Sequence, residues 1–265
     1  MSDVDIFHAP RDFEFHDFDT RNVTASDGGT ATLRFPRLDA DAVHALAASV
    51  RRHRAEKLAR YSTDGIVDVI ARAVELWTDP EYPERRLAER LIPAVTGYDA
   101  SMVRIELKRY MRMFRRRELL RFVDDELNCP QMLDEYRPNR SGGYTRLYGP
   151  ELSFHVFSSN VPGIPVWSMT MGLLTKSAIL GKSSFDEPLM PVLFARSLAK
   201  RRPRYGGRFG DCASRGGTRG FWRMPRLARR MRWSRTVRRT PPRRFARACV
   251  PESLSSATAR KSASR

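Results

Sequence analysis

The stretch FHVFSSNVPGIPVWSMTMGLLTKSAILGK, residues 154–182, sets the fold class of this chain. Residues 152–157 form a short β-rich run, and a Val-Pro-Gly break follows it after Ser-Ser-Asn. Residues 165–175 are predicted to be a helix and residues 177–181 a second strand. Two short apolar strands on either side of a helix predict a βαβ unit, and therefore a parallel sheet with a right-handed crossover.

A polar residue follows each predicted strand: Asn160 comes after the first, and Lys182 ends the second. In a parallel α/β sheet, ligands bind outside the carboxyl ends of the strands. We therefore expect both side chains to face one crevice, with Cα atoms on the order of 5–12 Å apart, because neighbouring strands lie about 4.8 Å apart. Residues 1–200 contain neither GxGxxG nor GxxxxGKS/T, which excludes the usual dinucleotide fingerprint and the P-loop.

The residues before this unit predict a hairpin followed by helices. An Asp-Gly-Gly turn at 27–29 precedes an alternating run at 30–35, which is typical of a hairpin. Apolar periodicity and caps predict helices that begin at Asp39, at residues 62–64, at Pro83 and at Asp99; the third is expected to end at Pro93 and the fourth to continue to Leu127. After Lys182, Asp186 is expected to cap a last helix that runs to Ala199, with Pro188 in its first turn.

The helix that begins at Asp99 has two predicted faces. Val103, Leu107, Tyr110 and Phe114 form its apolar stripe, and Leu119, Leu120 and Val123 continue inward after residue 116. Arg104, Lys108, Arg112 and Arg115 form a basic face, which could contact a phosphate backbone. We favour a solvated helix face as its interpretation.

The excess positive charge of the chain is confined to its last quarter. The formal net charge is +18, and residues 201–265 hold 19 Arg, one Lys and two acidic residues, so the body carries no excess charge. A high isoelectric point therefore describes the tail alone.

Three widely spaced cysteines, Cys129, Cys212 and Cys249, form no CxxC pair. They argue against a disulfide framework and a zinc knuckle and favour a reducing, cytoplasmic compartment. Cys129 has no neighbouring base, so we interpret it as a small apolar filler. His155 is expected to be a packed core residue, and the other histidines show no metal-binding spacing.

No membrane segment or leader is predicted. The N-terminus is acidic and lacks a long apolar run. The most apolar stretch, residues 161–181, is interrupted by Pro162 and Pro165, and a spanning helix needs about 20 mostly apolar residues.

The motifs SSNVPG at 158–163 and GLLTKSAILGKSS at 172–184 resemble those of the LuxC-like fatty acyl-CoA reductases, a branch of the aldehyde dehydrogenase superfamily. RLYGPELSFHVF at 146–157 and DEPLMPVLFARSLA at 186–199 also fit, so the resemblance covers about residues 25–200. It implies an α/β fold in which a helical region leads into the first βαβα of an aldehyde-dehydrogenase-like cofactor domain. The predicted divisions are an N-terminal arm and hairpin (1–36), a helical region (37–136), a partial cofactor-binding unit (137–200) and an arginine-rich, disordered or poorly packed tail (201–265).

The resemblance also implies roles for the residues at the strand tips. Asn160 would donate its side-chain amide to an oxyanion, and Lys182 would hydrogen-bond the ribose hydroxyls of a nicotinamide cofactor. Ser158, Ser159, Ser183 and Ser184 would lie along the cofactor. In relatives that prefer NAD, an acid three residues after the Lys holds the 2′-hydroxyl; Phe185 stands there in this chain, although Asp186 follows, and we therefore expect NADPH. The implied substrate is a long-chain acyl-CoA or acyl-protein thioester, with acyl-transferase or synthetase subunits as partners and a fatty aldehyde for luminescence or lipid metabolism as product.

The remaining parts of that family's chemistry are not found in this sequence. Its nucleophilic cysteine lies well over a hundred residues after the Asn, whereas Cys212 and Cys249 come too early and in arginine-rich surroundings. We expect a truncated reductase that is inactive alone and poorly soluble, with two parallel strands that lack their later neighbours. The tail has the composition of a GC-rich gene read out of frame. The alternative is a helical module whose arginine–glycine tail binds nucleic acid, as RYGGRFG at 204–210 suggests.

Overall fold

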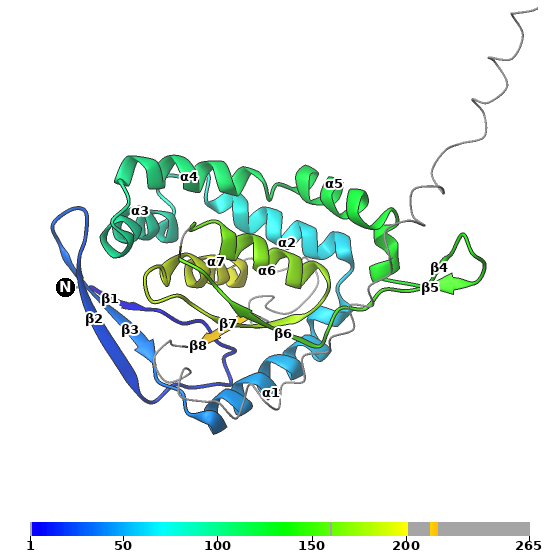
Figure 1. The fold of residues 1–265 in the computed structure, drawn as a ribbon, viewed down its shortest axis with the longest axis horizontal. Coiled ribbons are helices and arrows are strands. Elements are labelled where there is room, and N and C mark those ends of the chain that lie inside the picture. Colours follow the sequence, from blue (N-terminus) through cyan, green and yellow to red (C-terminus); the bar gives the residue numbers. More distant parts are fainter. Residues whose placement is uncertain (1, 160, 201–212, 217–265) are drawn as a thin grey trace, which may run out of the picture. The chain divides into compact units, whose positions relative to one another are not determined.

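The computed structural model describes residues 2–159, 161–200 and 213–216 (Figure 1). Their elements form a small N-terminal sheet, a group of helices, and a parallel sheet with two further helices. Among the described residues, no helix is both long enough and apolar enough to cross a membrane.

The N-terminal sheet has the strand order β1-β3-β2. It consists of β1 (Ser2–Asp5), β2 (Phe18–Thr24) and β3 (Thr30–Pro36). β2 and β3 are antiparallel, and the turn between them has Gly28 at φ 79°, where a glycine is favoured because it lacks a Cβ. The predicted hairpin is confirmed, and β1 joins it in parallel with β3.

The first four of the helices that follow begin within one residue of their predicted starts, and a fifth follows them. They are α1 (Ala40–Glu56), α2 (Thr63–Leu76), α3 (Pro83–Thr96), α4 (Ala100–Arg112) and α5 (Arg116–Leu127). Asp39, Ser62 and Asp99 each accept hydrogen bonds from backbone N–H groups in the first turn of α1, α2 and α4. These bonds satisfy donors that have no partner inside the helix.

Two predicted helix boundaries were wrong. α3 continues through Pro93 and ends only at Gly97, which adopts φ 75°, because the burial of Ile92 and Val95 on either side of the proline favours a continued helix. α4 and α5 are separate helices, and their junction buries Phe114 completely. Because α5 is a separate helix that begins at Arg116, the apolar stripe of α4 does not continue along it. Leu120, which was predicted to face the core, is therefore exposed.

The predicted parallel unit is confirmed. It consists of β6 (Leu152–Val156), α6 (Ile164–Leu174), β7 (Ala178–Lys182) and α7 (Leu189–Lys200), and β6 pairs in parallel with β7. A two-stranded hairpin of β4 (Arg137–Pro138) and β5 (Tyr144–Thr145) precedes it.

Two expectations for this unit are corrected. Glu187, not Asp186, caps α7, because its carboxylate accepts the N–H groups of Leu189 and Met190 at 3.0 and 2.8 Å. The helix therefore starts after Pro188. The second correction concerns the sheet edge: β8 (Ala213–Gly216) pairs in parallel with β7, although we expected no later neighbour. Pairing requires only backbone donors and acceptors, so a segment without an apolar pattern can supply it.

One hydrophobic core joins these elements. It includes Leu33 of β3, Ile70 of α2, Leu91 of α3, Ile179 of β7 and Phe194 of α7. A buried hydroxyl, that of Ser197 on α7, accepts hydrogen bonds from Trp77 Nε1 and Tyr82 Oη and donates to a backbone carbonyl. Because all three bonds are satisfied, this polar group can lie in the core without an unpaired donor or acceptor.

The turn that leads from α6 into β7 is held by an ion pair. Lys176 adopts φ 59°, and the backbone N–H groups of Lys176 and Ser177 bond to the carbonyls of Leu173 and Gly172, the Schellman arrangement that usually has glycine in this place. Lys176 Nζ lies 2.6 Å from Asp134 Oδ1; Lys176 is buried and Asp134 is half-buried. Asp134 also accepts the backbone N–H and the hydroxyl of Thr63 at the start of α2.

Two substitutions of Lys176 should separate the stability contributed by the ion pair from the energetic cost of the left-handed backbone at this residue. Lys176→Ala removes the ammonium and leaves the Asp134 carboxylate without its cationic partner, so we expect the free energy of unfolding to fall by about 2–4 kcal/mol. Lys176→Gly loses the same ion pair but relaxes the left-handed backbone, so its cost should be about 1 kcal/mol smaller. Denaturant unfolding measures both changes.

The control is Arg121→Ala, which removes an exposed pair with Asp125 at 3.5 Å and should cost less than about 0.5 kcal/mol. An equal, small effect of all three substitutions would contradict a stabilising role for this ion pair.

Candidate functional site

The carboxyl ends of β6 and β7 lie at the same edge of the sheet, as predicted. Val156 is the register partner of Lys182, and the N–H of Phe157 donates to the carbonyl of Lys182 at 2.9 Å. The chain therefore leaves both strands at one level, toward Ser158 from β6 and toward Ser183 from β7. Asn160 lies outside the described residues, so its distance from Lys182 stays a prediction.

Polar groups at the end of β7 are partly withdrawn from water. The Lys182 side chain is half-buried, and this burial lowers the pKa of its ammonium group. Ser183 is only 3% exposed, and its hydroxyl has no hydrogen-bond partner among the residues that the structure describes. A buried hydroxyl without a partner is costly, so this edge suits a polar ligand that would complete its hydrogen bonding.

The next residues on this edge are more open. Ser184 Oγ accepts the backbone N–H of Asp186 at 3.3 Å, and the side chains of Phe185 and Asp186 are exposed. On the segment that leaves β6, Ser158 is exposed and Ser159 is half-buried. The predicted serines thus lie on the two segments that leave the paired strand ends.

Arg21 of β2 reaches the end of β7, which the sequence did not predict. Its Nη1 donates to the carbonyl of Phe185 at 3.1 Å, and its guanidinium carbon lies 4.8 Å from the centroid of the Phe185 ring. The two residues are 164 positions apart, so no local pattern relates them. A cation is therefore held at the third residue after Lys182.

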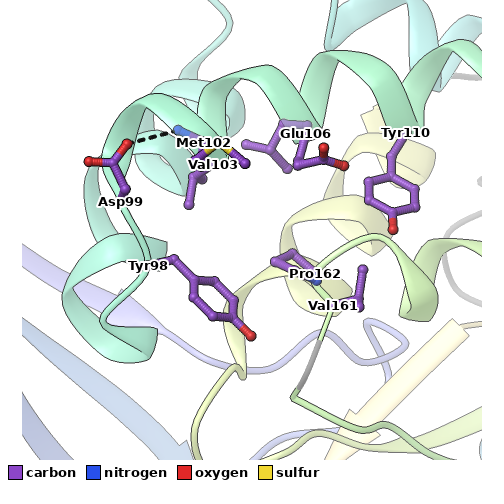
Figure 2. A pocket seen from close by; sticks show the side chains of 9 residues that line it. Tyr98, Asp99, Met102, Val103, Glu106, Tyr110, Val161 and Pro162 are labelled. Atoms are coloured by element: carbon purple, nitrogen blue, oxygen red, sulfur yellow. Dashed lines mark hydrogen bonds between the residues drawn. The ribbon is translucent and has the colours of Figure 1, made fainter.

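An apolar cavity of about 370 Å³ lies between α4 and the segment that follows residue 160 (Figure 2). Its wall on one side is α4 from its cap to Tyr110, and on the other side it is Val161 and Pro162. The lining residues are Tyr98, Asp99, Met102, Val103, Glu106, Leu107, Tyr110, Val161 and Pro162. The Asp99 carboxylate is engaged as the cap of α4 and accepts the N–H groups of Ser101 and Met102. The hydroxyl of Ser101, together with these N–H groups, lowers the pKa of Asp99.

A family model described as "Acyl-CoA reductase (LuxC)" matches residues 58–205, which is more than half of the chain. The chain belongs to the acyl-CoA reductase (LuxC) family. The resemblance predicted from residues 158–184 is thereby confirmed. The match ends where the arginine-rich composition begins.

Curated relatives of this LuxC family chain are long-chain acyl-protein thioester reductases. The protein of Photorhabdus laumondii is 26% identical over 141 residues, which are 53% of this chain and 29% of the relative. The protein of Aliivibrio fischeri is 29% identical over 124 residues, 46% of this chain and 26% of the relative. The match thus spans less than a third of the length of these relatives.

Solved aldehyde dehydrogenases share the fold of this LuxC family chain. The Δ-pyrroline-5-carboxylate dehydrogenase of Mycobacterium tuberculosis aligns with a TM-score of 0.59 and 16% identity, covering 83% of this chain and 38% of that protein. The glyceraldehyde-3-phosphate dehydrogenase of Methanocaldococcus jannaschii, solved with NADP, aligns with a TM-score of 0.59 and 14% identity, covering 78% and 42%. The predicted aldehyde-dehydrogenase-like fold is confirmed.

The remaining candidate residues of the LuxC family chain lie elsewhere or were misjudged. Cys129 precedes the short 3₁₀ helix η2 (Pro130–Leu133); it is partly exposed, with its thiol 3.4 Å from Gln131 Oε1, and is therefore not a buried filler. His155 Nδ1 lies 2.8 Å from Ser168 Oγ on α6, and its ring packs beside Phe157, in agreement with a packed residue. Cys212 and Cys249 lie outside the described residues, as does most of the tail, so the nucleic-acid alternative stays a prediction. Within the described ranges, no cluster of three metal-binding side chains occurs.

The segment between the strand tip and α6 requires glycine at residue 163. A Cβ built on Gly163 would lie 2.4 Å from ring carbons of Tyr110, although its backbone, with φ −78°, is open to any residue. Gly163→Ala should therefore lower the free energy of unfolding by about 1–3 kcal/mol through overpacking.

The matched test is the same substitution in a Tyr110→Ala background, where the ring is absent. We expect its cost to be at least halved there, as measured by denaturant unfolding in a double-mutant cycle. Equal costs in both backgrounds would show that contact with Tyr110 does not restrict residue 163.

Proposed function

We propose that this chain forms the cofactor- and acyl-binding part of an NADPH-dependent reductase that converts a long-chain acyl-CoA or acyl-protein thioester into a fatty aldehyde. The observation that carries the proposal is the placement of the paired strand ends beside the apolar cavity. Val161 and Pro162, which directly follow residue 160, line that cavity, while Lys182 ends the neighbouring strand. A cofactor on one side of residue 160 and an acyl chain on the other would meet there.

The end of β7 fits the polar part of a nicotinamide cofactor. The Lys182 ammonium would donate to ribose hydroxyls, and Ser183, whose buried hydroxyl has no partner among the described residues, would gain a hydrogen bond. The partial burial that lowers the Lys182 pKa favours a ligand that replaces the lost hydration with hydrogen bonds. When bound, the cofactor would supply the hydride.

Arg21 supports NADPH over NADH. An acidic residue at the third position after Lys182 would repel a 2′-phosphate, but Phe185 stands there and Arg21 lies over its ring. Arginine pairs well with phosphate because its planar group donates several hydrogen bonds at once. Arg21 is half-buried, and its bond to the Phe185 carbonyl lies at the surface, so its guanidinium could turn toward a ligand.

The cavity beside α4 would take the acyl chain. Its wall is largely apolar, and each CH₂ group that it removes from water contributes about 0.8 kcal/mol to binding. In the overall reaction the C–S bond of the thioester breaks, the acyl carbon gains a hydride, and the departing sulfur takes a proton. Asn160 would donate its amide to the carbonyl oxygen as negative charge develops there.

We also propose that the protein works in the cytoplasm. The 265-residue chain is expected not to complete this reaction alone. The family's nucleophilic cysteine is expected far beyond Asn160, and Cys129 is placed at η2 rather than after β6 or β7. The purified chain should therefore form no aldehyde from tetradecanoyl-CoA and NADPH, measured by trapping of the aldehyde. Aldehyde formation that is lost on substitution of Cys212 or Cys249 by Ser would contradict this.

The reading frame near codon 200 can be checked independently. Resequencing of the gene should place LuxC-like sequence in a neighbouring frame if the tail is read out of frame. A clean frame, with no such sequence downstream, would refute the frame hypothesis and leave the cofactor proposal intact.

Arg21→Gln should selectively weaken NADPH binding. Loss of a charge-assisted hydrogen bond costs about 1.5–3 kcal/mol, so we expect the NADPH Kd to rise about tenfold or more and the NADH Kd to change less than about threefold. Titrations followed by the fluorescence of the bound cofactor measure both constants. Phe185→Glu should shift the preference toward NADH, because a carboxylate would then face the 2′ position.

Arg37→Gln is the matched control, since Arg37 is an exposed arginine that directly follows β3, the neighbour of β2, and pairs with Asp17 at 3.4 Å. It should change neither constant appreciably. If Arg21→Gln weakened the binding of NADPH and NADH equally, Arg21 would only connect β2 to Phe185 structurally and would not bind the phosphate.

Met102→Lys should weaken binding of an acyl chain in the cavity. The probe is the tetradecanoyl thioester of N-acetylcysteamine, which carries no charge, and we expect its Kd to rise at least about tenfold in calorimetric titration because an ammonium would be placed against apolar chain. Met113→Lys, at a similarly exposed methionine that does not line the cavity, should have little effect. Equal affinities of the wild type and Met102→Lys would place the acyl chain elsewhere.

A further inference from the structure

The outward side of α4 combines exposed apolar and basic side chains. Met102, Ile105 and Met113 are 54%, 58% and 47% exposed, an unusual degree for large apolar residues on one helix and its cap. Lys108 and Arg112 are exposed beside them. We call these five residues the α4 outer face.

The basic residues of this face are not neutralised by neighbours. Arg104 lies 3.5 Å from Glu89, and Arg109 lies 3.6 Å from Glu106. By contrast, Lys108 and Arg112 form no ion pair or side-chain hydrogen bond with any residue in the described part of the chain, and neither does Arg115 just beyond the helix. The face therefore presents an uncompensated positive strip to the solvent.

The face is continuous with the apolar cavity. Met102 belongs to both, and Figure 2 shows its side chain on the first turns of α4 between Tyr98 and Glu106. From Met102 to Arg112 the helix rises about 15 Å. The cavity wall itself runs along α4 from Asp99 to Tyr110, so Lys108 and Arg112 lie on the same stretch of helix as the cavity.

We propose that the α4 outer face docks a small acidic protein that carries the acyl group as a thioester and delivers it to the cavity. This inference rests on the proposed acyl-binding function. Acidic side chains of the carrier would meet Lys108 and Arg112, and its apolar residues would pack on Met102, Ile105 and Met113. Methionine suits such a contact because its flexible thioether adapts to different partners.

The dimensions favour a protein over a coenzyme or a lipid surface. The phosphates of one coenzyme A molecule would need only cations, whereas on this face Lys108 and Arg112 lie among three exposed apolar side chains that extend from Met102 to Met113. A helix that lies on a lipid surface needs a continuous apolar face, but the main apolar face of α4, with Val103, Leu107 and Met111, is buried in the core. Three separate apolar side chains within a basic strip fit a protein interface with a polar rim.

The test measures binding of an acyl carrier protein loaded with a tetradecanoyl thioester to the full chain, by fluorescence anisotropy at 50 and 300 mM salt. In Lys108→Glu/Arg112→Glu we expect the Kd at 50 mM salt to rise at least about tenfold, because both reversed charges would face acidic groups. Wild-type affinity should fall at 300 mM salt.

The control variant is Arg51→Glu/Arg60→Glu, which reverses two exposed arginines without a described ion pair on α1 and on η1 (Leu58–Arg60). Both variants change the net charge equally and keep the basic tail. If the carrier bound to the tail alone, its Kd would therefore be the same for both variants. The control should retain wild-type affinity within about twofold. Equal losses in both variants, or no binding of the carrier by the wild type, would overturn the proposal.

Two further measurements distinguish failure of the docking proposal from lipid binding by this face and from failure of the acyl-cavity function. Vesicles with 30% phosphatidylglycerol should not distinguish the two variants; if they did while the carrier did not, the face would be a lipid-binding surface and the proposal would be wrong. The uncharged N-acetylcysteamine thioester should bind the wild type and Lys108→Glu/Arg112→Glu alike. If it failed to bind while the unloaded carrier still distinguished the variants, the acyl-cavity function would fail and the docking surface would stand.

Discussion

The ion pair of Lys176 and Asp134 holds the turn before β7, and the candidate site depends on that turn. Lys176 occupies a left-handed position that usually favours glycine, so its backbone costs about 1–2 kcal/mol that a contact must offset. Asp134 supplies this contact at 2.6 Å, while the carbonyl of Lys176 accepts a hydrogen bond from Arg54 Nε at 2.8 Å. The end of α1, the start of α2 and the turn between α6 and β7 therefore meet at one point.

β7 begins directly after this turn and connects it to the candidate site. β7 is five residues long and fully buried until Lys182, so the position of Lys182 follows from where the strand begins. β6 and β8 pair with it on either side, and the first residues after β6 lead into the cavity wall at Val161 and Pro162. The end of β7 and the cavity wall are in this way coupled through backbone pairing.

The charges of the chain divide according to their surroundings. Most ion pairs on the helices are exposed and contribute little to stability, whereas the pair of Lys176 and Asp134 is largely buried and fixes a turn. Arg21 is held over Phe185 by one backbone bond and a ring contact, which leaves its charge available at the surface. Lys108 and Arg112 have no described ion-pair partner, so their charge is directed outward. The net charge of +18 describes none of these local arrangements.

The sequence by itself determined the local elements: the hairpin at residues 27–29, the capped helix starts at Asp39, Ser62 and Asp99, and the parallel unit that ends on Lys182. Alternation, caps and turn residues act between near neighbours. The LuxC family was indicated separately, by the resemblance of the motifs at residues 158–184. Only the tertiary structure decided which elements touch: Arg21 with Phe185, Asp134 with Lys176, the start of α4 with Val161, and β8 with β7. The tertiary structure alone also showed that Leu120 is exposed and that Glu187 caps α7. The physical reason is that periodicity shows which face of an element is buried, but the partner of that face is set by packing and backbone pairing between residues far apart in the chain.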